Sequence, residues 1–154
     1  MLRNTWPFEF LLCLALLAPY HGSAQISDKE LQADKYFERQ LFEKASELYQ
    51  KALKKVSDNE ILTVKLARTN FMLDRIPEAY VYYSSTIHKR YLVKSQDYLN
   101  YALVLQSLQK FDGAQKWALK YLQFDPRNEV AQNLLISLEQ EMNHLGNAQD
   151  ITWL

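Results

Sequence analysis

The sequence contains few of the residues on which catalytic and metal-binding sites usually depend. Its 154 residues include one cysteine, Cys13, and three histidines. A single cysteine excludes an intrachain disulfide, and no two histidines have the spacing of a zinc site. The three glycines, at positions 22, 113 and 146, are too far apart to form a phosphate-binding loop. We find no nucleophile beside a base, so the residues indicate neither an enzyme nor a cofactor or metal site.

Neither charge nor aromatic content indicates a nucleic-acid-binding protein. The 18 basic residues balance 18 acidic residues, so net charge implies no attraction to nucleic acid or to an anionic membrane. Tyr80, Tyr82, Tyr83 and Tyr91 lie close together in the sequence. The repeat pattern described below already assigns Tyr82 and Tyr83 to the core. We therefore expect packing here rather than a stacking platform for bases.

The first 24 residues differ in composition from the rest of the chain. Arg3 precedes an apolar run at 10–18, and small residues follow at 22–24. A short apolar core ahead of small residues is typical of a secretory signal peptide, and we expect cleavage after Ala24. The alternative is a membrane anchor, although the run has about half of the roughly 20 residues that span a bilayer. Cleavage would remove the only cysteine, so the mature chain would tolerate an oxidising compartment.

Three segments of the chain share one pattern of small and aromatic residues. They begin at positions 42, 76 and 111, and steps of 34 and 35 residues separate them. Another small residue lies 12 residues ahead of the small residue in each segment, so a pair of helices is the repeating unit. Small residues let two helices approach to about 8–10 Å, and a period of this length indicates a helical-repeat array. The small-residue pairs are Ala33 with Ala45, Ala67 with Ala79, and Ala102 with Ala114. We place the extra residue of the longer step in the connection around 90–94.

Over residues 26–142 this pattern resembles the tetratricopeptide repeat (TPR). The resemblance implies an all-α fold, a TPR-like α-solenoid of three helix pairs with a C-terminal capping helix. Asn70 stands where an aromatic residue is usual, and Tyr121 stands where a small residue is usual. The resemblance rests on Ala33, Tyr36, Phe42, Ala45, Tyr49 and Ala52, on Leu66, Ala67, Ile76, Ala79, Tyr83 and Thr86, and on Ala102, Leu105, Phe111, Ala114 and Asp125-Pro126.

We expect seven helices and no sheet, with a repeat domain at 25–144 and a tail at 145–154. The tail could fold back, be disordered, or begin a further domain. The seventh helix, stopped by Gly146, should cover the third repeat, because a helical array needs a cap at its end. The expected helices run over about 28–40, 42–56, 57–74, 77–89, 95–109, 111–124 and 129–144. The residues expected at helix starts are the caps Ser27, Ser57, Ser95 and Asn128 and, in a first turn, Pro77. The residues of the seventh helix that should face the third repeat are Val130, Leu134, Leu135 and Leu138.

The resemblance also implies a partner-binding groove, because the first helices of successive TPR pairs line the concave face. Positions 64, 68 and 71 share one helix face, so apolar side chains could dock there while a partner carboxylate meets Arg68. We expect Arg68 to be a surface residue whose reversal to glutamate leaves folding nearly intact. The groove residues are Glu30, Asp34, Phe37, Val64, Lys65, Arg68, Phe71, Leu99, Asn100 and Leu103.

Two observations limit this groove hypothesis. Some TPR proteins hold a chaperone's C-terminal carboxylate with lysine, asparagine and arginine, but Glu30 and Asp34 occupy the lysine and asparagine places here. That function is therefore disfavoured. A solvated helix face would explain Glu30, Asp34 and Glu38 equally well. If Phe37, Val64, Phe71 and Leu99 prove exposed, a binding surface explains them better.

The sequence thus favours a non-enzymatic protein–protein interaction module without cofactors, which binds a protein or peptide partner in the concave groove. The order of signal peptide and repeats also resembles the N-terminal part of envelope proteins of the outer membrane protein A family. That resemblance implies a periplasmic or outer-membrane-associated location and possible association with outer-membrane or cell-wall proteins. The alternative is a structural or assembly subunit of an envelope or secretion complex. It would act through its convex face or tail and could be a truncated relative of a larger peptidoglycan-associated protein.

Export can be tested directly, because the expected cleavage site is a single peptide bond. The mature protein should begin at Gln25, since Gly22-Ser23-Ala24 fits the recognition of a signal peptidase. N-terminal sequencing of protein from the native cell checks this. A chain that still begins at Met1 in the membrane fraction would support the anchor instead.

Overall fold

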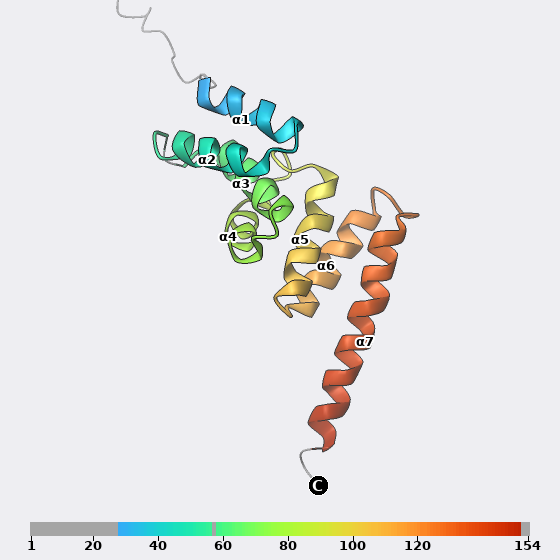
Figure 1. The fold of residues 1–154 in the computed structure, drawn as a ribbon. Coiled ribbons are helices and arrows are strands. Elements are labelled where there is room, and N and C mark those ends of the chain that lie inside the picture. The colour runs from blue at the N-terminus through green and yellow to red at the C-terminus, as the bar shows by residue number, and fades with distance from the viewer. Residues whose placement is uncertain (1–27, 57, 152–154) are drawn as a thin grey trace, which may run out of the picture.

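The computed structural model describes residues 28–56 and 58–151, with side chains described through residue 145. The expectations for the signal peptide, for capping by Ser27 and Ser57, and for the tail from 152 lie outside the described residues. Within the described residues the chain is all-α, as predicted, with no strand (Figure 1). The helices are α1 (Asp28–Glu38), α2 (Phe42–Leu53), α3 (Glu60–Met72), α4 (Ile76–Thr86), α5 (Ser95–Ser107), α6 (Phe111–Leu122) and α7 (Glu129–Ile151).

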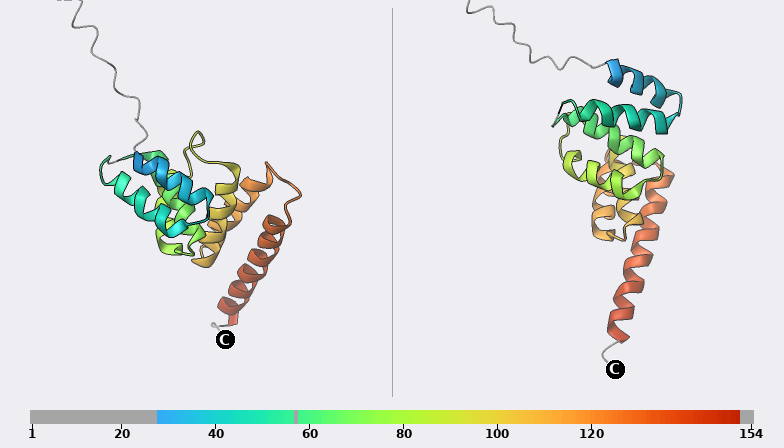
Figure 2. Two further views of the ribbon diagram at one scale, coloured as in Figure 1. Left: turned by 45° about the horizontal axis from the view of Figure 1, so that its top comes forward. Right: turned by 60° about the vertical axis from the view of Figure 1, so that its left-hand side comes forward.

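The helices form three antiparallel pairs, α1–α2, α3–α4 and α5–α6, and α7 lies against the last pair (Figures 1 and 2). The two alanines of each pair are fully buried between their helices. This confirms that the small residues mark places of close approach. The connection 87–94 is longer than 54–59 and 123–128, which fits the position predicted for the extra residue.

The same type of turn connects the two helices of each pair, and none of the three turns contains glycine. Gln40, Asp74 and Gln109 lie at equivalent repeat positions with φ of 58°, 56° and 55°. The next backbone N–H in each turn donates to the carbonyl five residues earlier, at 2.9 Å in all three cases. This is the hydrogen-bonding pattern of a Schellman motif. Such a motif contains one residue with positive φ, and that residue is usually glycine. Glutamine and aspartate therefore hold a left-handed conformation that costs free energy.

The helix starts were predicted with mixed success. Pro77 lies in the first turn of α4, and Asn128 caps α7 by accepting from the Ala131 N–H at 3.1 Å, both as expected. The prediction that Ser95 caps α5 is wrong. Lys94 precedes the helix, and the Asp97 carboxylate accepts its backbone N–H at 2.7 Å. Asn59 caps α3 through the Leu62 N–H at 3.0 Å.

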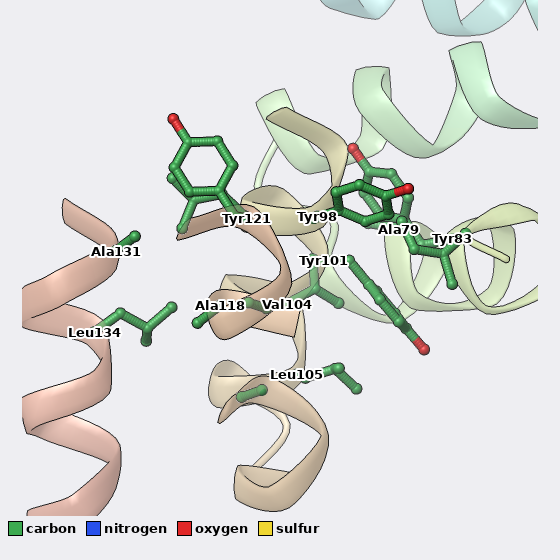
Figure 3. Close-up of a cluster of buried hydrophobic side chains, with 14 of the residues drawn as sticks. Ala79, Tyr83, Tyr98, Tyr101, Val104, Leu105, Ala118, Tyr121, Ala131 and Leu134 are labelled. Atoms are coloured by element: carbon green, nitrogen blue, oxygen red, sulfur yellow. The ribbon is translucent and has the colours of Figure 1, made fainter. Parts of the chain in front are cut away.

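The larger hydrophobic cluster joins the second and third repeats to α7 (Figure 3). Tyr83, Tyr101 and Tyr121 are all buried in it. Tyr121, which replaces the usual small residue, packs in this cluster together with Ala131 and Leu134 of α7. Asn70, the other departure, is buried and donates to the Leu66 carbonyl at 2.8 Å. Both departures are thus accommodated within the regular helix pairs.

The capping helix covers the third repeat with a slightly different face from the one predicted. Leu134 and Leu138 are buried and Leu135 is partly buried, as expected. Val130 is 56% exposed, because Ala131 takes the buried position at the start of α7. Gly146 does not stop the helix, which continues to Ile151. A glycine in a helix interior costs only about 1 kcal/mol, which the surrounding helix can offset.

Replacing Gln109 with glycine should stabilise the protein by about 1 kcal/mol, because glycine adopts a positive φ without the steric penalty of a side chain. Gln106→Gly, three residues earlier within α5, should instead destabilise it by about 1 kcal/mol. Urea unfolding of both variants measures the difference. Equal destabilisation by both would show that the turn at Gln109 does not hold this conformation in solution.

Candidate functional site

A pocket of about 420 Å³ lies where the first helices of the three repeats come together. We call it the groove pocket. It includes four of the predicted groove residues, Asp34, Phe37, Lys65 and Arg68. Its lining consists of Asp34, Phe37 and Glu38 from α1, Tyr49 from α2, Lys65 and Arg68 from α3, and Lys94, Gln96 and Asp97 at the start of α5.

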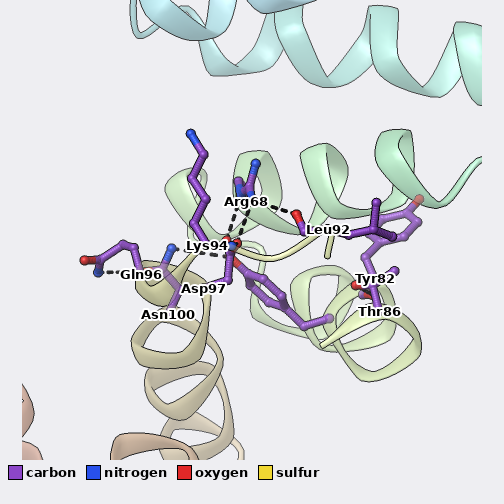
Figure 4. A network of polar contacts seen from close by, with 9 residues as sticks. Arg68, Tyr82, Thr86, Leu92, Lys94, Gln96, Asp97 and Asn100 are labelled. Atoms are coloured by element: carbon purple, nitrogen blue, oxygen red, sulfur yellow. Dashed lines mark hydrogen bonds and ion pairs between the residues drawn. The ribbon is translucent and has the colours of Figure 1, made fainter. Parts of the chain in front are cut away.

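Arg68 is held by a carboxylate of its own chain (Figure 4). Its Nε donates to Asp97 Oδ1 at 2.7 Å, and its Nη2 donates to Asp97 Oδ2 at 2.6 Å. The Asp97 carboxylate is almost fully buried and also accepts from the Lys94 N–H at 2.7 Å and the Tyr83 hydroxyl at 3.3 Å. A bidentate pair with such additional donors is among the strong hydrogen-bonded arrangements in proteins. Arg68 is thus a partly buried, paired residue of the pocket rather than a freely exposed one.

The protonation states of this network follow from its burial and its charges. Burial raises the pKa of Tyr83 and the Asp97 charge raises it further, so the phenol stays a neutral donor. Burial alone would lower the pKa of Arg68, but the hydrogen bond and charge of Asp97 outweigh it and raise that pKa. Arg68 thus remains a cation around neutral pH.

Lys65 is also engaged within the chain. Its Nζ lies 2.8 Å from Glu30 Oε1 and 2.8 Å from Asp34 Oδ2, so α3 is tied to α1. The Tyr49 hydroxyl donates to Asp34 Oδ1 at 2.6 Å. Burial, followed by the hydrogen bond to Asp34, raises the pKa of Tyr49. Two acidic residues therefore surround one lysine, and the α1 side of the groove pocket keeps negative charge.

Several other predicted groove residues belong to the core. Val64, Leu99 and Asn100 are 2%, 3% and 9% exposed, so the exposure that would make Val64 and Leu99 part of a binding surface is absent. Phe71 and Leu103 are partly buried against the larger cluster. The reason is geometric: a first helix packs against its own partner and against the neighbouring repeats, which leaves only a narrow strip facing the groove. Phe37 is part of that strip, with its ring edge against Phe42 at 5.2 Å between centroids.

Sequence reasoning missed three pocket residues, Tyr49, Lys94 and Asp97. Lys94 is exposed and precedes α5, and its ammonium makes no ion pair with any residue that the structure describes. In Figure 4 its side chain extends away from Asp97. The sequence did contain a clue, because Asp97 lies three residues after Lys94, the spacing at which a first-turn acid bonds the backbone N–H ahead of a helix.

Two further properties concern membranes and metals. None of the helices in the described part of the chain is long and apolar enough to cross a bilayer. The described residues also contain no group of three histidine, cysteine or acidic side chains placed to hold a metal ion.

Solved structures with a similar fold are TPR domains. The first TPR of Spaghetti (RPAP3) bound to the HSP90 peptide SRMEEVD shares 22% identity at a TM-score of 0.60, over 75% of this chain and 90% of that chain. MamA of AMB-1 shares 15% identity at a TM-score of 0.65, over 78% of this chain and 65% of that chain. The Sgt2 TPR domain of Aspergillus fumigatus shares 15% identity at a TM-score of 0.56, over 77% and 80%.

No protein-family model matches the sequence, and no curated protein matches it either. At these low identities the solved structures establish the fold alone. The chain therefore has the tetratricopeptide-repeat fold, as the sequence predicted.

Removing the Arg68 charge should destabilise the protein strongly, because Asp97 would stay buried without its cation. We expect Arg68→Met to cost about 3–5 kcal/mol. Arg75→Met is the matched control, since Arg75 pairs with Glu43 at 2.6 Å but both side chains are exposed, and its cost should stay below about 1 kcal/mol. Guanidinium unfolding compares the two. Similar small costs for both variants would show that Asp97 does not depend on Arg68.

Proposed function

We propose that the protein is a non-enzymatic interaction module that holds a peptide segment of a protein partner in the groove pocket. The observation that carries this proposal is the pocket itself, which first helices of three successive repeats line together. Its size suits a few side chains of a bound segment. Phe37 offers an apolar contact, while Glu38 and Lys94 are exposed charges that a partner can reach.

The charges of the pocket indicate what that segment carries. Arg68 is paired with Asp97, and Lys65 is shared between Glu30 and Asp34. The available cation is therefore Lys94 at the α5 side, and the α1 side is acidic. A segment with an acidic residue near Lys94 and a basic residue toward α1 fits this arrangement, because opposite charges across an interface favour the correct register.

The structurally similar TPR domains support peptide binding in general, but they do not support recognition of the same peptide by this chain. RPAP3 was solved with an HSP90 peptide, so this fold can hold a peptide. In this chain Glu30 and Asp34 stand where a carboxylate clamp would place lysine and asparagine. Both lie against Lys65. Recognition of a C-terminal carboxylate is therefore not part of the proposal.

The proposed location is the cell envelope. Its support is the composition of residues 1–24 and the resemblance to the N-terminal repeats of outer membrane protein A family proteins. The partner would then be an exported protein or a protein associated with the outer membrane. N-terminal sequencing, described above, tests the export on which this location depends.

The alternative is an assembly subunit that acts through its convex face or tail. It is favoured by the course of α7, whose C-terminal turns extend past the ends of α5 and α6 (Figures 1 and 2). A helix that projects from the repeats can contact another protein without any use of the groove.

Crosslinking from the groove separates the two functions. A photoreactive amino acid at Gln96, which is exposed and lines the groove pocket, should crosslink the partner in the native cell. Lys94→Glu should reduce that product at least about fivefold, because it reverses the available cation. Lys110→Glu is the matched control: Lys110 is also exposed and immediately precedes a helix, but it lies outside the groove pocket. It should leave the product unchanged.

Three outcomes would contradict the groove proposal. The first is the absence of any crosslinked product from Gln96. The second is a product that Lys94→Glu leaves as strong as in the wild type. The third is a product that disappears when residues 151–154 are deleted while Lys94→Glu has no effect, which would support the alternative.

A further inference from the structure

A second pocket, of about 390 Å³, lies between the end of α4 and the surface of α6. It shares no lining residue with the groove pocket. We call it the α6 pocket. Its lining comprises Ile87, His88 and Arg90 after α4, Tyr98 from α5, Lys116, Trp117, Leu119 and Lys120 from α6, and Gln123 after it.

The charged side chains of the α6 pocket are all basic. Arg90, Lys116 and Lys120 line it together with His88, and none of the described lining residues is acidic. In contrast to Lys65 and Arg68, these three cations form no ion pair with any residue in the described part of the chain. The pocket therefore presents positive charge that no carboxylate among the described residues neutralises.

The aromatic rings that line the pocket, Tyr98 and Trp117, already have contacts on their faces. Tyr98 stacks on Trp117 at 5.5 Å and on Phe124 at 5.8 Å between ring centroids. The ammonium of Lys116 lies 5.8 Å from the Trp117 centroid, and that of Lys120 lies 5.8 Å from the Phe124 centroid. A nucleic-acid base would need an open ring face on which to stack. The pocket thus offers cations rather than a stacking platform.

The scaffold does not require this basic cluster. Lys116 and Lys120 correspond to Val81 and Ser85 in the second repeat and to Glu47 and Lys51 in the first, by the repeat steps of 34 and 35 residues. Lysine at both of these repeat positions thus occurs in the third repeat alone. Beside them, Leu119 is 50% exposed and Phe124 is 59% exposed. Charge and exposed apolar surface therefore occur together at a place where repeat packing needs neither.

We propose that the α6 pocket binds an acidic segment of a protein partner. Aspartate or glutamate carboxylates would pair with Arg90, Lys116 and Lys120, and an apolar side chain would contact Leu119 and Phe124. An anionic membrane fits less well, because recognition of lipid headgroups usually uses clusters of about four to eight basic residues. A concave pocket of this size instead suits inserted side chains. This site is separate from the groove pocket, so either can exist without the other.

Binding of a defined acidic peptide to the purified full chain tests the proposal. The probe is a short fluorescein-labelled peptide in which glutamates flank one leucine and one phenylalanine, followed by fluorescence anisotropy. Lys120→Glu should weaken its binding at least about tenfold, and added salt should weaken wild-type binding because it screens exposed charges. Lys51→Glu is the matched control, since Lys51 and Lys120 lie in the last turns of their helices at equivalent repeat positions. It should change binding less than about twofold.

Further arms of the experiment distinguish other ligands. The same peptide with glutamine in place of glutamate should not bind, and vesicles containing phosphatidylglycerol should not bind in a manner that depends on Lys120. Equal melting temperatures of the two variants by circular dichroism exclude unfolding as the cause of lost binding. The proposal is overturned if Lys120→Glu binds the peptide as well as Lys51→Glu does, or if the glutamine peptide binds equally well. It is also overturned if only vesicles, or a second copy of the chain, bind through Lys120.

Discussion

Close approach of paired helices at alanine is the constraint on which the structure depends. Each repeat places one alanine from each helix at the crossing, and all six are fully buried. Only a very small side chain lets helix axes come this near. This closeness buries one side of each first helix against its partner, and the neighbouring repeats cover further residues. The groove pocket thus depends on packing within the pairs and between the repeats.

The ion pairs then join one repeat to the next. Lys65 connects α3 to α1, and the Arg68–Asp97 pair connects α3 to α5. Both cations come from α3, so the central repeat holds its neighbours on each side through polar contacts at the groove. Because Asp97 is buried, its pairing contributes more to the choice of one geometry than an exposed ion pair would. The lining of the groove pocket and the inter-repeat junction are therefore built from the same residues.

The fold could be predicted from the sequence because it depends on local patterns. Two alanines at a constant spacing, repeated three times, define the helix pairs, and Pro77 and Asn128 mark helix starts. The groove residues could not be predicted as well, since their roles depend on contacts distant in sequence. Arg68 and Asp97 are 29 residues apart, and no helical period shows that they meet. Val64 and Leu99 lie on the predicted helices, but neighbouring repeats bury them.

The pairing of Arg68 with Asp97 has a consequence for selectivity. Asp97 acts as a tethered competitor: a carboxylate that is always present beside the guanidinium at an effective concentration that a free partner rarely reaches. An incoming acidic group has to displace it and leave a buried charge without its cation. A ligand that relied on Arg68 alone would therefore bind poorly in the groove pocket. A ligand that gained its affinity from several weaker contacts at once would not face this competition.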